Sequence, residues 1–163
     1  MSRSMFIIGL FASGCLVTAH PSAFAQERTD IPPLLQDKIK QAEAACAEFD
    51  KGRFALEWGS IVRVDLDGDG REDWVLNERK FSCSTAASIY SGTGGSMSHF
   101  LIDERLSSLL NQGWDITTVG SQRVLVADSH GSNCGGINPT PCMTASVWDR
   151  EEKVWRSAGA KWE

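Results

Sequence analysis

The feature that most constrains the fold is a series of short segments in which apolar residues alternate with polar ones, beginning near residue 54. Over residues 61–66, the apolar side chains at every second position would share one face of a strand. No helical pattern separates these segments, which favours antiparallel pairing. Further strands are predicted over residues 74–76, 86–90, 99–103, 114–119, 124–127, 143–148 and 153–157.

One helix is expected before these strands, over residues 33–49. Its apolar residues recur at steps of three and four and so share one helical face. These residues are Leu35, Ile39, Ala42, Cys46 and Phe49. The predicted fold class is therefore mainly β with one N-terminal helix, as a small antiparallel β-sandwich or partly open barrel stapled by disulfides.

The first 25 residues have the pattern of a signal peptide, with Arg3 followed by an apolar stretch and a small-x-small sequence ending at Ala25. The apolar stretch is shorter than the ~20 residues that span a bilayer. Cleavage near Ala25 predicts a periplasmic or secreted protein with a single domain over 26–163 and no transmembrane segment. Cys15 ends a weak lipobox-like sequence, so lipid anchoring is the alternative.

Charge and composition limit the classes of partner. The chain carries 16 Lys and Arg against 21 Asp and Glu, a formal charge of −5. Nucleic-acid binding usually requires a basic surface, so we expect no nucleic-acid partner. Hydrophobic residues make up 42% and charged residues 23%, which is typical of a globular domain.

Four cysteines follow the predicted leader: Cys46, Cys83, Cys134 and Cys142. An even number in an exported protein predicts two disulfides. Zinc is the less favoured interpretation, because the chain has no CxxC pair of the kind that holds zinc. The segment between Cys134 and Cys142 contains Gly, Asn and Pro and can turn back on itself, which favours a bond between these two. Cys46 would then pair with Cys83 and join the helix to the sheet.

The most specific motif is the nine-residue sequence Asp65-Leu66-Asp67-Gly68-Asp69-Gly70-Arg71-Glu72-Asp73. Calcium takes six to eight oxygen ligands, often from such closely spaced aspartates. The expected ligands are the carboxylates of Asp65, Asp67, Asp69 and Asp73 and the backbone carbonyl of Arg71. The twelfth position is Leu76 instead of the Glu of an EF-hand. The alternative is an acidic turn without an ion.

This loop resembles the DxDGDGxxD calcium loops of FG-GAP and dockerin-type modules. Together with the segments 92–95, 130–136 and 141–148, it makes the chain similar to uncharacterised secreted or periplasmic proteobacterial proteins that carry one such loop. The resemblance implies a periplasmic calcium-loop protein and implies no activity.

Two further segments are rich in small and polar residues. The Gly-rich segment 91–96 is predicted to be a hairpin connection, with a ligand-binding loop as the alternative. The segment 128–136 contains His130 and is predicted to be a surface loop closed by a disulfide. Its alternatives are a binding site or a catalytic site.

The expected function is a non-enzymatic calcium-binding domain that binds another envelope component, either a protein or a glycan. One alternative is a small envelope hydrolase with His130 as the general base and Ser129 or Ser132 nearby. Another is an inhibitor of a secreted enzyme. A pocket joining His130 to a second titratable group, such as His99 or Asp128, would favour the hydrolase.

Overall fold

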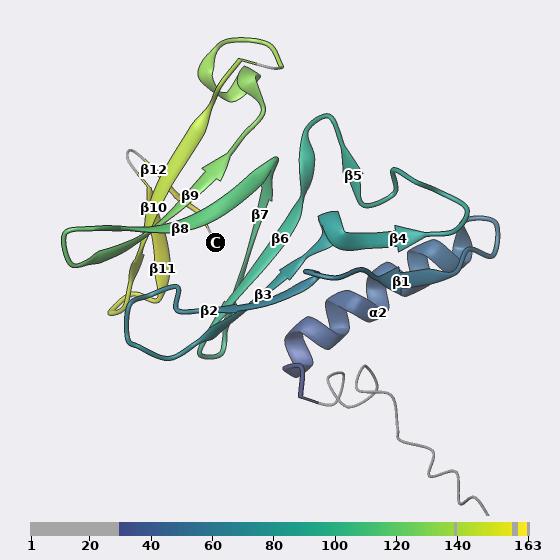
Figure 1. Cartoon of the computed structure of the whole chain (residues 1–163), viewed down its shortest axis with the longest axis horizontal. Helices are drawn as coiled ribbons and strands as arrows, with labels where there is room; N and C mark the ends of the chain where they lie inside the picture. The colour runs from purple at the N-terminus through teal and green to yellow at the C-terminus, as the bar shows by residue number, and fades with distance from the viewer. Residues whose placement is uncertain (1–29, 139, 158–159, 163) are drawn as a thin grey trace, which may run out of the picture. The chain divides into compact units, whose positions relative to one another are not determined.

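The computed structural model describes residues 30–138, 140–157 and 160–162 (Figure 1). The leader predicted for residues 1–25 lies outside them. This part of the chain is mainly β, with one α-helix, α2 (Pro33–Glu48), and two short 3-10 helices, η1 (Glu78–Lys80) and η2 (Gly131–Cys134). None of the helices in these described ranges is both long and apolar enough to cross a membrane.

The strands form one small and two larger sheets, in which every pairing with a recorded register is antiparallel. The strands are β1 (Phe54–Leu56), β2 (Ile61–Val64), β3 (Asp73–Asn77), β4 (Phe81–Cys83), β5 (Ser91–Gly92), β6 (Gly95–Ile102), β7 (Arg105–Asn111), β8 (Gly113–Val119), β9 (Gln122–Asp128), β10 (Met143–Asp149), β11 (Val154–Ser157) and β12 (Ala160–Trp162).

The first larger sheet has the order β2-β3-β6-β5, and β7 also pairs with β6. The second has the order β12-β11-β10-β9-β8, and β1 pairs with β4 in the small sheet. The two larger sheets do not close into a barrel and face each other through a shared core. The predicted fold class, antiparallel and mainly β with one helix, is confirmed. Of the two predicted forms, the structure has the one that resembles a sandwich.

The core lies between the two larger sheets. The first sheet contributes Val75, Phe100 and Ile102, and the second contributes Leu125 and Trp155, all at most 1% exposed. The Phe100 and Trp155 rings meet edge to face, with their centroids 6.1 Å apart. Side chains of both larger sheets therefore pack against the opposite sheet.

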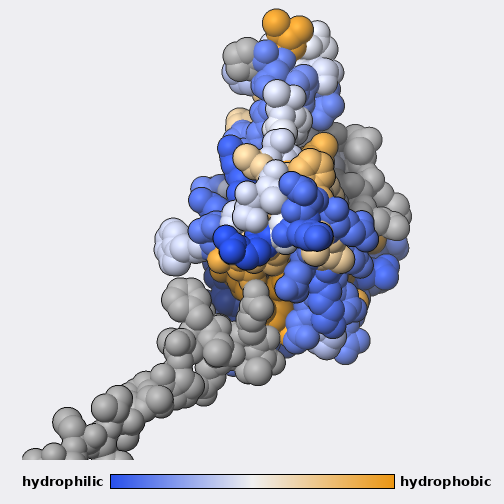
Figure 2. Space-filling view, turned by 90° about the vertical axis from the view of Figure 1, so that its right-hand side faces the viewer, coloured by the Kyte–Doolittle hydropathy of each residue, from blue (hydrophilic) through white to orange (hydrophobic). Residues whose placement is uncertain are grey.

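Helix α2 lies alongside β1 and β4 (Figure 1). Its buried residues are Leu35, Ile39, Ala42 and Cys46, four of the five predicted. The fifth, Phe49, lies just after the helix and is 54% exposed. Figure 2, viewed from the side on which β1, β4 and β5 lie, shows a mainly hydrophilic surface with small apolar patches.

Both predicted disulfides are present. Cys46–Cys83 joins α2 to β4 across 37 residues of sequence. Cys134–Cys142 closes an eight-residue separation and holds the loop that connects β9 to β10. One bond therefore fastens the helix to the sheets, and the other constrains a single loop.

One strand prediction was wrong, and one long strand was missed. Residues 86–90 form turns, and the Tyr90 hydroxyl donates a hydrogen bond of 2.6 Å to the Ala42 carbonyl of α2. The seven-residue strand β7, which pairs with β6 along its whole length, was not predicted. The Gly-rich hairpin was predicted correctly, because Ser91 pairs with Ser96 and Gly92 with Gly95.

Candidate metal centre

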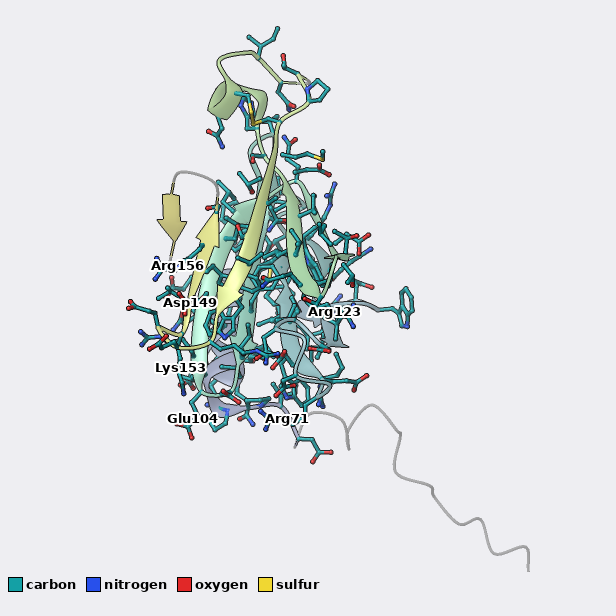
Figure 3. All side chains as sticks on the ribbon, turned by 90° about the vertical axis from the view of Figure 1, so that its left-hand side faces the viewer. Arg71, Glu104, Arg123, Asp149, Lys153 and Arg156 are labelled. Carbon is teal, nitrogen blue, oxygen red and sulfur yellow. A yellow bond between two sulfur atoms is a disulfide. The ribbon has the colours of Figure 1, made fainter. Side chains whose placement is uncertain are left out.

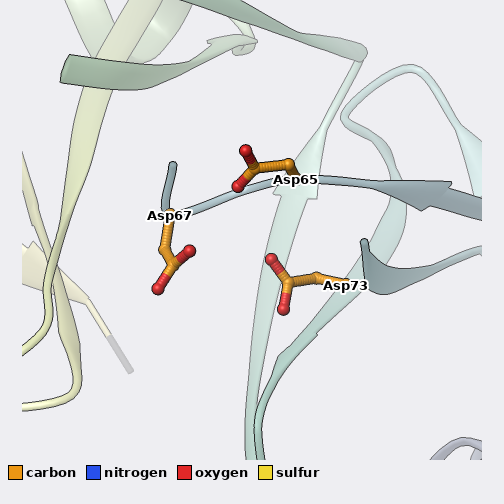
Figure 4. A group of neighbouring side chains, drawn as sticks. All are labelled: Asp65, Asp67 and Asp73. Carbon is orange, nitrogen blue, oxygen red and sulfur yellow. The ribbon is translucent and has the colours of Figure 1, made fainter. Parts of the chain in front are cut away.

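The aspartate loop connects β2 to β3 at the end of their hairpin. It brings together three of the four predicted aspartates: Asp65, Asp67 and Asp73 each offer a carboxylate oxygen within 4.8 Å of the others. Their carboxylates point into one common space (Figure 4). The side chains of Asp65 and Asp67 are only 17% and 9% exposed, so this acidic group is partly shielded from water.

Backbone hydrogen bonds fold the loop around these carboxylates. The Asp65 carboxylate accepts from the Gly68 and Gly70 N–H groups, at 2.6 and 3.2 Å. Both glycines have positive φ angles, of 80° and 86°, which glycine adopts without a steric penalty. At the other end, Asp73 accepts a 2.9 Å bond from the N–H of the buried Leu66. The loop therefore stays compact around its acidic centre.

Asp69 is held differently from the other three predicted carboxylate ligands. It accepts a 2.7 Å bond from the Arg71 N–H and lies 2.6 Å from the Arg71 guanidinium. These contacts lower the pKa of the Asp69 carboxyl, chiefly through the backbone hydrogen bond. The same guanidinium reaches Asp103 in the β6–β7 turn, at 3.3 Å. The roles of Asp69 and the Arg71 carbonyl as calcium ligands remain predictions.

Two arginines from the second sheet also reach the loop. Arg150, in the turn after β10, donates a 2.8 Å bond to the Asp67 carbonyl and lies 3.4 Å from its carboxylate. Arg123 of β9 lies 3.6 Å from the Asp65 carboxylate, and its position and that of Arg71 are labelled in Figure 3. The local motif gave no sign of either contact, because both arginines lie more than 50 residues further along the chain.

These arginines do not balance the acidic charge. Five carboxylates, from the four loop aspartates and Asp103, face three guanidiniums, which leaves a formal charge of −2 before Glu72 is counted, whose exposed side chain has no recorded contact with this group. The excess negative charge affects Asp73. Burial, together with the neighbouring aspartates, raises the pKa of its carboxyl to about 6. Hard oxygen ligands with a −2 surplus suit a divalent cation such as calcium.

The 128–136 segment does not join His130 to an acid through any recorded contact of the described residues. The His130 Nδ1 lies 2.8 Å from the Ser132 Oγ, and the Ser132 N–H also donates to it, at 3.2 Å. His130 thus caps the short helix η2, in a loop closed by the predicted disulfide.

A cavity of about 750 Å³ lies nearby, between this segment and the Gly-rich hairpin. Among the described residues its walls include Asp128, Ser129 and Thr93 but not His130. The pocket that would have favoured His130 as a general base is therefore not formed around it.

Comparisons with protein-family models, curated proteins and solved structures found no match for this chain. The site is consequently defined by its own geometry. That geometry is a shielded group of three carboxylates at a hairpin end, with a residual negative charge.

Proposed function

We propose that this chain is an exported calcium-binding domain in which the ion fixes the β2–β3 loop. The observation that carries the proposal is the convergence of Asp65, Asp67 and Asp73 within 4.8 Å, beside arginines that are too few to balance the acidic charge. Calcium would remove the repulsion among these carboxylates and use their oxygens as ligands.

Export is supported by the sequence of the first 25 residues and is compatible with the two disulfides, which persist mainly in oxidising compartments. Extracellular calcium reaches about 1 mM, which is sufficient for sites with Kd values near 10⁻⁴ M. The binding of another envelope component, a protein or a glycan, remains a prediction from the sequence.

Thermal unfolding of the chelator-treated protein tests the calcium proposal. With a Kd on the order of 10⁻⁴ M and 1 mM free calcium, binding should stabilise the fold by about 1.4 kcal/mol. The melting temperature should therefore rise when calcium is added. Asp67→Ala should abolish the rise, because it removes a central carboxylate of the group.

Glu72→Ala is the matched control, because it removes a negative charge from the same loop without removing a predicted ligand. It should keep the calcium-dependent rise. If wild type shows no rise, or if Asp67→Ala and wild type rise equally, the loop is only an acidic turn. Magnesium at the same concentration should stabilise less, since it binds poorly in flexible all-protein sites.

A further inference from the structure

A second group of polar side chains lies on the face of the first sheet that is turned away from the core. His99 of β6 is 3% exposed, and both of its ring nitrogens are engaged. Nδ1 lies 2.7 Å from the Ser108 Oγ, and Nε2 lies 2.8 Å from the Glu78 carboxylate. The sequence suggested His99 only as a titratable partner of His130 and did not predict this group, because its members belong to three separate elements.

The strand register places these groups together. His99 and Ser108 are directly opposite each other in the β6–β7 pair, so their side chains project to the same face. Glu78 opens η1, immediately after β3, which pairs with β6 on its other side. The three side chains therefore converge from neighbouring positions on a rigid sheet.

The hydrogen bonds define where the protons lie when the imidazole is neutral. An ionised carboxylate only accepts hydrogen bonds, so Glu78 requires the proton to be on Nε2. The Nδ1 lone pair is then available, and it accepts the Ser108 hydroxyl hydrogen. This is the arrangement of a serine nucleophile, a general base and an orienting carboxylate, with the two ring nitrogens exchanged relative to the usual triad.

All three residues line one cavity of about 350 Å³ beneath α2. Its wall also contains apolar side chains, from Ala45, Ile89 and Met97. The side chains of Lys38 and Gln41 line the helical side of the cavity, and both carry N–H donors. The Glu78 side chain is 20% exposed, against 4% for His99, so the base is the more deeply buried of the two.

We propose that Ser108, His99 and Glu78 form a serine-hydrolase site for carboxylic esters with a short acyl chain. The cavity volume is at the lower end of the range for small-molecule sites, and the apolar wall suits the hydrocarbon part of a short acyl group. This activity is independent of calcium binding and would make the domain an enzyme, against the expectation from the sequence.

The reaction needs no co-reactant except water. The Ser108 Oγ–H bond breaks, its proton passes to the His99 Nδ1, and Oγ bonds to the ester carbonyl carbon while the C=O π pair moves to the carbonyl oxygen. That pair then re-forms the carbonyl, the bond from the carbon to the alkoxy oxygen breaks, and the Nδ1 proton passes to the leaving alkoxide, which departs as the alcohol. Water repeats the two steps on the acyl-serine and releases the carboxylic acid. Glu78 is a positioning residue, because it acts only through the His99 ring.

The His130–Ser132 pair supplies an internal comparison. Its nitrogen-to-oxygen distance, 2.8 Å, is nearly the same as in the His99–Ser108 pair. Among the recorded contacts of the described residues, only the His99 pair has a carboxylate on its second ring nitrogen. Its members also line one cavity. A difference in reactivity between the two serines would therefore come from the carboxylate and the cavity.

The experiment treats the full chain with a fluorophosphonate probe and maps the modified residue by mass spectrometry. Hydrolysis of p-nitrophenyl acetate is followed in parallel. Wild type should be labelled at Ser108 and should hydrolyse the ester. Ser108→Ala should lose both signals, and Ser132→Ala should keep both. Glu78→Gln should lower kcat by about 10²-fold and leave KM little changed, a split that a general loss of folding would not produce.

Unlabelled wild type would overturn the proposal, and so would equal labelling of Ser108 and Ser132. Heat-unfolded wild type is a second control that needs no substitution: its Ser108 should not be labelled, since the reactivity requires the folded geometry. Labelling that survives unfolding would show ordinary chemical modification and would also overturn the proposal.

Discussion

The aspartate loop is held by charge, whereas the junction between α2 and β4 is held by a covalent bond and by packing. In the loop, carboxylates face one another and the arginines leave a negative surplus. At the junction, the Cys46–Cys83 bond lies among buried residues. The stability of the loop should therefore depend on calcium and pH, and the stability of the junction should depend on the disulfide and on steric fit.

The largest expected effect is the loss of the Cys46–Cys83 bond. In the chain-entropy approximation, opening this long closure should lower the free energy of unfolding by about 3.9 kcal/mol, against about 2.6 kcal/mol for Cys134–Cys142. Urea unfolding of the two double Cys→Ala variants would measure both values. Equal losses, or a larger loss at Cys134–Cys142, would show that the junction does not have the greater effect.

A smaller effect is expected from Gly52→Ala. A Cβ at residue 52 would overlap the Cys83 sulfur, the Thr85 side chain and the Cys46 carbonyl. Overpacking of this kind should cost roughly 1–3 kcal/mol of unfolding free energy. Gly94→Ala is the control, because a Cβ there meets no atom within 4 Å. Denaturant midpoints that shift equally in the two variants would show that the junction tolerates the extra methyl group.

The smallest expected effect is the response of the loop to pH. Since the pKa of Asp73 is raised to about 6, the calcium-free folded state binds a proton more tightly than the unfolded state. Asp73 should therefore contribute most to stability below its unfolded pKa, and this contribution should be lost as pH rises from about 4 to about 6.

Calcium binding should show the opposite trend, because a protonated Asp73 carboxyl must lose its proton to bind the ion. The apparent affinity should fall about tenfold between pH 7 and pH 5. Calorimetric titration at the two pH values would measure this change. In Asp73→Asn the affinity should be weaker and nearly independent of pH over this range, and a tenfold change that persisted there would assign the proton to another group.

The sequence was sufficient where the pattern is local. The apolar face of α2 and the β8–β9 hairpin follow from periodicity and from turn chemistry, with Gly120 at a φ of +63°. Both disulfides followed from the spacing of the cysteines and the turn-forming residues between Cys134 and Cys142. In the aspartate loop, the spacing correctly predicted that Asp65, Asp67 and Asp73 converge. Asp69 is the exception, because it pairs with Arg71 instead.

The sequence was insufficient where tertiary contacts decide. Strand β7 reads Arg-Leu-Ser-Ser-Leu-Leu-Asn, without regular alternation, and it buries Ser107 and Asn111. Its strand conformation is determined by pairing with β6 along its length. The convergence of Glu78, His99 and Ser108 has the same origin, because only the register of β3, β6 and β7 brings these residues together.

Strand β6 pairs with three others, and this has a consequence for the order of folding. The β6–β7 and β8–β9 hairpins turn within two residues, so their ends meet after the closure of a very short loop. The β3–β6 pairing instead requires closure of a longer loop, which contains η1, β4 and β5. Non-local pairing slows folding because loop entropy is lost before contacts form. We expect the hairpins to gain protection from hydrogen exchange first. Formation of the β3–β6 pairing should then limit the rate at which the sandwich is completed.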